Sequence, residues 1–328
     1  MTAIDLAAVE RAAEALFAPD APHGLSLALV VLQSGRPVFE RYGHQPDTMF
    51  GPGGPVTADT TLVSWSMAKS ITHAAVGVLV GEGRLQLDAP APVPAWAGTP
   101  KVAITLQHLL NMRSGLEFVE DYVDDATSHC LEMLYGAGNS DMAAYAAGQA
   151  LVHEPGAVWS YSSGTTNIIS RIVGDAVGGG EEGMEAFLRD RIFSPAGMRS
   201  AIPKFDPAGT FIGSSFVDAT ALDFARFGEL YRNDGVASDG TRVLPAGWRE
   251  HARTRTATDP ETGFDYGAHW WMWPDFEGSL ACHGYEGQLT VVLPDRELVV
   301  VHLGKSPVEL QPRMHDQLRA VFRAATAV

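Results

Sequence analysis

The stretch Ser66-Met67-Ala68-Lys69 begins a segment in which small and apolar residues recur at helical spacing. The recurring residues are Ala68, Ile71, Ala74, Ala75, Val78 and Leu79, and Gly81 and Gly83 end the pattern. Positions i and i+3 of a helix lie ~5–6 Å apart on one face. The spacing therefore predicts that the Lys69 amine reaches the Ser66 hydroxyl at the start of a helix.

A serine and a lysine placed in this way fit nucleophilic catalysis. A serine hydroxyl is a weak nucleophile and needs a neighbouring base. A lysine serves as that base only where burial or nearby positive charge keeps it partly neutral. The helix N-terminus also directs backbone N–H groups toward the reacting centre. Chance is the alternative, because Ser-x-x-Lys is a common pattern, but its position between a loop and a strongly apolar helix favours catalysis.

Two further stretches carry candidate chemistry. Trp159-Ser160-Tyr161-Ser162-Ser163-Gly164 precedes an apolar helix, and its phenol could pass a proton to a leaving group. The alternative is a helix N-cap with an aromatic staple. Ala281-Cys282-His283-Gly284-Tyr285-Glu286-Gly287-Gln288 opens a strand, whose glycines allow close approach of a ligand and whose backbone N–H could hold an oxyanion. The alternative there is a glycine-containing turn into an edge strand.

Strand patterns occur at both ends of the chain, and helical patterns lie between them. The expected strands are 25–32, 37–42, the aromatic-rich 267–273, 289–293 and 298–303, and segment 51–55 is expected to be loop. The expected helices are 3–17, 104–111, 140–150, 165–177, 183–193, a short helix around 221–231, and 311–326. This order predicts an α+β fold with one antiparallel sheet built from both chain ends, flanked by the terminal helices. Residues 1–75 and 210–328 would form the sheet lobe, and 76–209 an inserted, mostly helical lobe.

The composition excludes several classes of protein. The chain has 328 residues, of which 46% are hydrophobic and 19% charged, which excludes a disordered or fibrous chain. A net charge of −16 argues against nucleic acid or an anionic membrane as main partner. Two cysteines are too few for a disulfide framework or a zinc site. The start of the chain lacks a secretory-signal pattern and no apolar run reaches ~18 residues, so a cytoplasmic location is expected.

Together, and in this order, the three stretches resemble the active-site elements of the serine β-lactamase and penicillin-binding-protein superfamily. The segments 102–116, His153-Glu154-Pro155-Gly156 and 192–198 resemble other motifs of that superfamily, so the likeness covers nearly the whole chain. The acidic stretch Glu120-Asp121-Tyr122-Val123-Asp124-Asp125 and the segment 284–288 resemble the class C-related esterases and the 6-aminohexanoate-dimer hydrolase type. The resemblance implies a β-lactamase/transpeptidase-like fold with the site in the cleft between the lobes.

The resemblance also implies roles for individual residues. Ser66 would be the acylated nucleophile and Lys69 its base, and Tyr161 would share proton transfer and protonate the leaving group. The backbone N–H groups of Ser66 and Tyr285 would form the oxyanion hole. The substrate-binding residues would be Ser163, Tyr122, His283 and Gly284. Ser163 stands where lactamases usually have Asn, and Cys282-His283-Gly284 replaces their Lys-Thr-Gly. The missing lysine argues against an efficient lactamase, because its charge binds the carboxylate of β-lactams.

The sequence thus predicts a serine hydrolase that forms an acyl-enzyme on small esters or amides, with no metal or organic cofactor. One alternative is a weak β-lactamase or D-aminopeptidase-like amidase. Another is a catalytically inactive binding protein of the same fold. The expected partner is a small ester or amide, and the pattern does not determine the oligomeric state. Trp159, Trp270, Trp271 and Trp273 are expected in the core or the wall of an aromatic acyl pocket.

Overall fold

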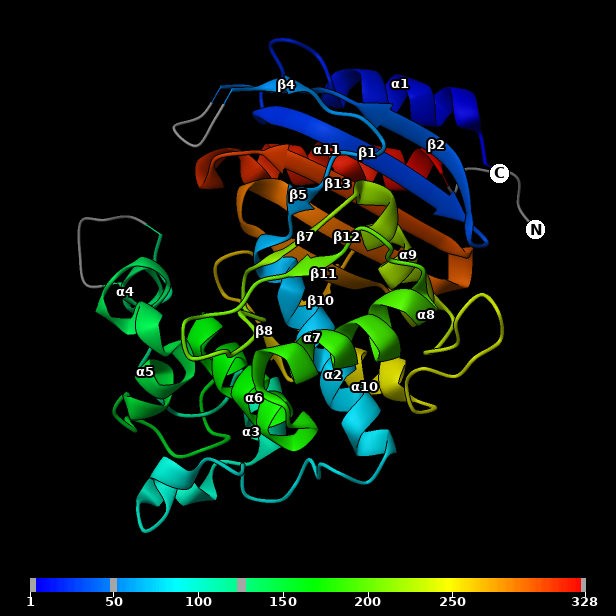
Figure 1. Cartoon of the computed structure of the whole chain (residues 1–328). Helices are drawn as coiled ribbons and strands as arrows, with labels where there is room; N and C mark the ends of the chain where they lie inside the picture. The colour runs from blue at the N-terminus through cyan, green and yellow to red at the C-terminus, as the bar shows by residue number, and fades with distance from the viewer. Residues whose placement is uncertain (1–3, 48–51, 123–127, 326–328) are drawn as a thin grey trace.

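The fold is organised around an antiparallel sheet to which both ends of the chain contribute strands (Figure 1). The computed structural model describes residues 4–47, 52–122 and 128–325. In that part, eight strands pair in the order β2-β1-β13-β12-β11-β10-β9-β8. The strands are β1 (Leu25–Gln33), β2 (Arg36–Tyr42), β8 (Ala257–Thr258), β9 (Asp265–Tyr266), β10 (Trp271–Met272), β11 (Leu280–Gly284), β12 (Gln288–Leu293) and β13 (Leu298–Lys305). The prediction of one antiparallel sheet made from both chain ends is confirmed.

Helices cover both faces of this sheet, which explains why its central strands β1, β12 and β13 are buried along nearly their whole length and are mostly apolar. In Figure 1, α1 (Leu6–Leu16) and α11 (Gln311–Ala324) lie together on one face. Their buried side chains form one core with the alternating residues of β1, β12 and β13 that point toward these two helices. On the other face, α2 (Ala68–Gly81) and α9 (Ala221–Arg232) contribute to a second, larger core. The sheet therefore separates two apolar cores.

The helical middle of the chain packs beyond α2, away from α1 and α11 (Figure 1). Its helices are α3 (Leu106–Leu110), α4 (His129–Tyr135), α5 (Met142–Gly148), α6 (Ser163–Val177), α7 (Gly180–Leu188) and α8 (Ser194–Ala196), and α10 (Trp248–Arg253) follows α9. Oxygen-bearing side chains cap several of the helices, as their type favours. These N-caps are Asp5, Thr105, Ser128, Asp141, Ser162 and Thr220. Residue 75 lies within α2, and the division into two lobes stays a prediction.

Short strands hold the chain near Ser66. β5 (Leu62–Val63), β6 (Ile202–Pro203) and β7 (Val217–Ala219) form a small sheet in the order β5-β7-β6. β3 (His44–Gln45) pairs with β4 (Gly54–Pro55), where only loop was expected over 51–55. Gly53 permits this pairing, because a Cβ at that position would lie 2.1 Å from the carbonyl oxygen of Gln45. Gly51, also in the predicted loop, lies outside the described residues.

The segment 267–273 also differs from expectation, because it is not one strand. It runs through a tight turn between β9 and β10, in which the N–H of Gly267 donates to the carbonyl of Trp270 at 2.9 Å. His269 has a φ of 58° in this turn. Its imidazole reaches the helical part of the molecule, with Nδ1 2.8 Å from the Leu110 carbonyl and Nε2 2.9 Å from the Thr166 hydroxyl. Tertiary contacts of one buried histidine thus override the strand pattern.

Candidate active site

Ser66 lies in a single 3₁₀ turn, Trp65–Met67, that runs directly into α2. The preceding residue, Ser64, anchors this turn to β7. Its N–H donates to the Val217 carbonyl at 2.9 Å, and its hydroxyl accepts from the Val217 N–H at 3.0 Å. Trp65 has a φ of 44°, in the left-handed region that a tryptophan rarely adopts. The nucleophile candidate is thus held at the N-terminal end of a buried helix by a turn that the small sheet fixes.

Lys69 makes the contact that its spacing predicts. Its Nζ lies 2.9 Å from the Oγ of Ser66. Two further contacts fill the remaining directions around Nζ, one to the Ser163 Oγ at 2.9 Å and one to the Ser214 carbonyl at 2.9 Å. When the amine is neutral, it can donate to Ser163 and Ser214 and accept the Ser66 proton on its lone pair. The three contacts therefore suit a general base.

The surroundings of Lys69 favour the neutral amine that this role needs. Only 2% of the residue is exposed, and burial lowers the pKa of its amine from the ordinary value. The nearby carboxylate of Glu120 acts in the opposite direction and raises that pKa. His269 does not add a competing titration, because burial lowers its pKa to about 3. The balance between burial and Glu120 therefore sets the charge of Lys69.

Tyr161 packs against the amine of Lys69. The Lys69 Nζ is 4.9 Å from the centre of the Tyr161 ring. Burial, followed by the Glu120 charge, raises the pKa of the Tyr161 phenol above its usual range, and a hydrogen bond with Ser66 partly opposes this. The phenol is therefore protonated at neutral pH. A protonated phenol beside Ser66 can give a proton to a leaving group, as its predicted role requires.

Glu120 joins this group, although no sequence motif singled it out as a site residue. Its Oε2 accepts from the Ser163 N–H at 2.7 Å, and its Oε1 accepts from the Ser163 hydroxyl at 2.5 Å. Its Oε1 also accepts from the Tyr122 hydroxyl at 2.9 Å and from the Cys130 thiol at 3.6 Å. Ser163 is the first residue of α6, so the carboxylate lies at a helix N-terminus, where negative charge is stabilised.

The structure brings two of the predicted substrate-binding residues to this group. Ser163 connects Lys69 to Glu120 through its hydroxyl and is buried. Tyr122 is 37% exposed, and its ring centre lies 5.1 Å from that of Tyr285. It is therefore close to the predicted oxyanion segment. The remainder of the predicted acidic stretch, residues 123–125, lies outside the described residues.

The third motif, on β11, comes close to the nucleophile turn at Gly284. A Cβ at this position would lie 2.4 Å from the Ser64 carbonyl oxygen and 3.3 Å from the Trp65 Cβ. Because strand side chains alternate between faces, Cys282 joins the core that contains α2, whereas Ala281 joins the core under α11. The close approach at Gly284 supports the expected alignment of Cys282-His283-Gly284 with the third motif.

His283 shares the face of Ala281 and packs away from Ser66. Its imidazole stacks on Trp271 at 5.4 Å and accepts from the Trp273 indole N–H at 3.0 Å. The ring of His315 on α11 lies 5.8 Å away. Burial lowers the pKa of His283 well below its usual value, so the imidazole is neutral. Its role in substrate binding stays a prediction, and the residue is half-buried, with contacts to aromatic side chains on the α11 side of the sheet.

The turn that follows Gly284 is anchored at each of its carbonyl groups. The Gln288 side chain donates to the Tyr285 carbonyl at 3.1 Å, and the Ser306 N–H donates to the Glu286 carbonyl at 2.9 Å. The Nδ1–H of His302 donates to the Gly287 carbonyl at 2.8 Å. These contacts hold the backbone of Tyr285 in place. A rigid N–H donor is what an oxyanion hole requires, and the assignment of Ser66 and Tyr285 to it stays a prediction.

With this geometry in place, comparison with known proteins identifies the family. A sequence model of the family described as Beta-lactamase matches residues 10–324. The chain belongs to the beta-lactamase family. The superfamily resemblance of its motifs is thereby confirmed, and the chain is placed among the serine hydrolases related to the beta-lactamases.

Several members of the beta-lactamase family and fold are similar to this chain. Penicillin-binding protein 4 of Amycolatopsis lactamdurans is 29% identical over 275 residues, 72% of this chain and 68% of that protein. A 6-aminohexanoate-dimer hydrolase of Paenarthrobacter ureafaciens is 27% identical over 276 residues, 74% of this chain and 65% of that protein. The chain thus spans about two thirds of the length of these relatives. A family VIII carboxylesterase structure has a TM-score of 0.74 at 16% identity and 97% coverage of both chains, which shows a shared fold.

Gly284→Ala tests whether the beta-lactamase-family third motif must touch the nucleophile turn. The added methyl would need the strand to move by about 1 Å, and a displacement of that size at a reacting centre costs about 10²-fold in rate. We expect turnover of an ester substrate to fall by about that factor in steady-state kinetics.

Gly174→Ala is the matched control for this substitution. A Cβ at Gly174, on α6, has no neighbour within 4 Å, so this variant should keep wild-type turnover. Wild-type turnover in Gly284→Ala would show that β11 can shift without loss of activity. It would contradict the inference that close contact at Gly284 is needed for catalysis.

Over 4–47, 52–122 and 128–325, no group of three or more His, Cys, Asp or Glu side chains is arranged to hold a metal ion. Over the same ranges, no helix has the length and apolar character needed to cross a lipid bilayer.

Proposed function

We propose that this chain is a serine hydrolase that acts on small esters or amides through an acyl-enzyme on Ser66. The observation that carries this proposal is the 2.9 Å contact between the Nζ of the buried Lys69 and the Oγ of the half-buried Ser66. A buried lysine is costly unless it has a function or a full set of partners. Here its partners are two hydroxyls and one carbonyl, so a neutral amine satisfies all of them.

The proposed reaction moves protons between three side chains. Lys69 takes the Ser66 proton as Oγ attacks the substrate carbonyl carbon, and the oxygen that becomes negative is held by the N–H groups of Ser66 and Tyr285. Tyr161 gives its proton to the leaving alcohol or amine as the acyl bond breaks, and the Lys69 ammonium restores it. Water then attacks the acyl-enzyme carbonyl carbon and gives a proton to the same pair. The pair passes that proton to the Ser66 Oγ as its bond to the acyl carbon breaks, which releases the carboxylic acid and restores the Ser66 hydroxyl.

The charges around the site favour substrates without a carboxylate close to the scissile bond. Cys282 stands where lactamases have the lysine of Lys-Thr-Gly, and burial raises the pKa of its thiol to about 12, so it is neutral. Glu120 adds a negative charge next to Ser163. A β-lactam brings a carboxylate to this region, where, of the two residues just named, the Cys282 thiol offers no positive charge and the Glu120 carboxylate repels it. Uncharged esters and amides avoid that penalty, so we place them ahead of β-lactams.

Aromatic side chains beside Tyr161 suit a small apolar acyl group. The Trp271 ring centre lies 5.4 Å from that of Tyr161, and the Trp159 ring lies 6.2 Å from that of Trp271. Tyr266 packs against both tryptophans, at 5.6 Å and 4.7 Å. Trp270 and Trp273 instead belong to the two cores on either side of the sheet. The expected aromatic wall is therefore limited to Trp159 and Trp271.

The test of this function is the detection of the acyl-enzyme. Purified protein is incubated with p-nitrophenyl acetate, p-nitrophenyl butyrate and nitrocefin, and intact mass is recorded during turnover. We expect ester hydrolysis, an acyl adduct that peptide mapping places on Ser66, and nitrocefin hydrolysis at least about tenfold slower in kcat/KM. Faster nitrocefin turnover would replace our proposal with the β-lactamase alternative, which the similarity to penicillin-binding protein 4 favours. No turnover and no adduct with any of the three would favour an inactive binding protein.

A further inference from the structure

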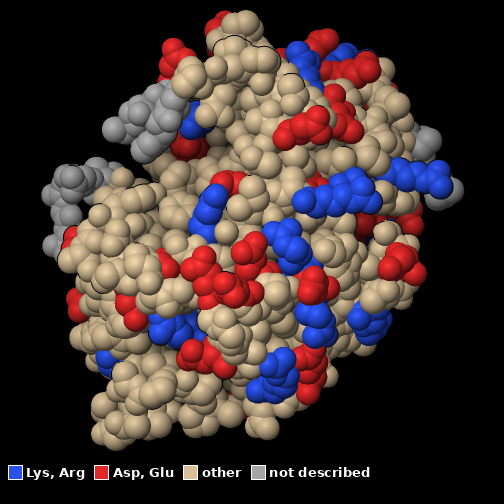
Figure 2. All heavy atoms as spheres, in the orientation of Figure 1, with Lys and Arg blue, Asp and Glu red and all other residues tan. Residues whose placement is uncertain are grey.

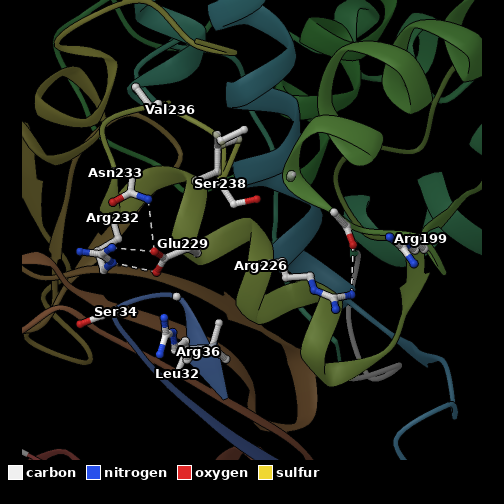
Figure 3. Close-up of a pocket in the computed structure, with 15 residues that line it drawn as sticks. Leu32, Ser34, Arg36, Arg199, Arg226, Glu229, Arg232, Asn233, Val236 and Ser238 are labelled. Carbon is white, nitrogen blue, oxygen red and sulfur yellow. Dashed lines mark hydrogen bonds and ion pairs between the residues drawn. The ribbon is translucent and has the colours of Figure 1, made fainter. Parts of the chain in front are cut away.

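A cavity outside the Ser66 site lies between the end of the β1–β2 hairpin, the C-terminal half of α9 and the turn after α8 (Figure 3). Its volume is about 510 Å³, within the range of small-molecule sites. Four arginines line it, namely Arg36, Arg199, Arg226 and Arg232. One carboxylate, that of Glu229, lines it as well. In a chain of net charge −16, this wall is unusually basic.

Two of these arginines are held in place by carboxylates. Arg226 donates from Nη1 to the buried Asp223 at 2.7 Å and to the Gly197 carbonyl at 3.1 Å. Arg232 forms a two-point pair with Glu229, at 2.7 Å and 2.6 Å, which Figure 3 shows as two dashed lines. These pairs orient the two guanidinium groups. In each pair, the negative charge of one carboxylate is balanced by the positive charge of one arginine. They leave the Nε and Nη2 of Arg226 and the Nη1 of Arg232 without a partner in the described part of the chain.

The other two arginines have no such compensation. Neither guanidinium, that of Arg36 or that of Arg199, makes a hydrogen bond or ion pair with any residue in the ranges that the structure describes. Arg36 follows the tight turn at Ser34 and Gly35, which have φ values of 49° and 78°. Its place at the end of the hairpin is therefore set by the turn. Figure 2 shows basic side chains gathered in a row over this face of the molecule.

One further carboxylate, that of Glu297, acts on this group from outside the lining. It accepts from the Ser34 hydroxyl at 2.6 Å and, after the hydrogen-bonded Glu229, helps to raise the pKa of the Arg232 guanidinium, but it does not line the cavity. Asn233 and Ser238 add polar groups to the lining, and the Asn233 amide donates to Glu229 at 3.2 Å. The cavity thus presents spare N–H donors of four guanidinium groups from three separate segments. Planar guanidinium groups match the oxygens of carboxylates and phosphates.

We propose that this cavity binds a small polyanion that carries at least two phosphate or carboxylate groups. One anionic group would meet Arg36 and Arg232 on the hairpin side, and the other would meet Arg199 and Arg226 on the α8 side. The proposal does not rest on the hydrolase activity, because the cavity and the Ser66 site have no residue in common.

The test is direct binding of two probes that differ in the anionic group. Isothermal titration calorimetry is run with sodium tripolyphosphate and with trisodium citrate at one fixed ionic strength, because salt screens such contacts. We expect saturable binding of at least one probe, and the tighter one identifies phosphate or carboxylate as the preferred group. In the variant Arg36→Gln/Arg199→Gln, we expect the Kd of that probe to rise at least about tenfold. Both side chains lack partners in the described residues, so the variant should fold.

A charge-matched variant separates the cavity from general attraction to anions. Arg11→Gln/Arg313→Gln removes the same two charges from exposed positions on α1 and α11, outside the cavity. Its Kd should stay within about twofold of wild type, with thermal melting as the check on folding for all variants. The proposal is overturned when neither probe binds the wild-type protein, or when the α1/α11 variant weakens binding as much as the cavity variant.

Discussion

Replacing Ser66 with alanine is expected to abolish the acyl adduct and to lower ester turnover on the order of 10⁴-fold or more. The reason is that the attacking atom itself is lost, and removal of a nucleophile costs that much in serine hydrolases. The Lys69 Nζ keeps its contacts with the Ser163 hydroxyl and the Ser214 carbonyl, so the site should retain its shape. Steady-state kinetics with p-nitrophenyl butyrate and intact-mass measurement on the same samples check this.

Ser70→Ala is the matched control for Ser66→Ala. Ser70 lies four residues further along the same helical stretch, and its buried hydroxyl donates to the His269 carbonyl at 2.8 Å. Its loss removes the same atom from the same helical stretch, at a buried position, whereas Ser66 is half-buried. The control should keep the adduct and lower turnover by no more than a few-fold. An adduct that survives in Ser66→Ala would remove Ser66 as the nucleophile.

Replacing Lys69 with methionine is expected to lower kcat/KM by about 10²- to 10⁴-fold, the usual contribution of a general base. Methionine keeps most of the volume of the buried side chain but cannot accept the Ser66 proton. Lys101→Met is the control, because its Nζ also donates to a backbone carbonyl, that of Ala147 at 2.9 Å, outside the site. Circular dichroism shows whether each variant is folded. Near wild-type kcat/KM in a folded Lys69→Met protein would exclude Lys69 as the base.

Glu120→Gln tests how the charge of Lys69 is controlled. A lysine base is active only when neutral, so the rate falls as pH falls through the pKa of Lys69. Because the Glu120 carboxylate raises that pKa, its removal should lower the pKa and move the acidic limb of the kcat/KM profile to lower pH. Glutamine can still accept from the Ser163 N–H. An acidic limb that stays in place or moves to higher pH would contradict the assignment of this limb to Lys69.

Local patterns were sufficient for most of the architecture. Apolar runs and turn signals located β1, β12 and β13 and the helices α1, α2, α6, α9 and α11, because side-chain periodicity follows directly from backbone geometry. The Ser66–Lys69 contact followed from the i, i+3 spacing alone. Segment 267–273 was misjudged, because the turn at His269 depends on contacts with Leu110 and Thr166, far away in the sequence.

In the candidate active site too, local motifs identified some residues, whereas tertiary contacts alone placed others. Tyr161 was found from a local motif, but nothing local placed Glu120 on Ser163, since the two residues are 43 positions apart. The position of His283 behind Trp271 depends on the face of β11 that α11 covers, and the motif alone did not reveal it. The cavity lined by Arg36, Arg199 and Arg226 unites three segments with no shared pattern.

By itself, the sequence determined the fold class, the buried helix that begins near Ser66, and the reach of Lys69 to the Ser66 hydroxyl. The helix and the reach of Lys69 depend on neighbours within a few residues, whose geometry the chain imposes, and the fold class follows from the order of the strand and helix patterns along the chain. Only the tertiary structure decided that Glu120 opposes the effect of burial on Lys69, and that Gly284 comes close to Ser64. The physical reason is that charge and close approach act through space, between segments whose distance the packing of both cores sets.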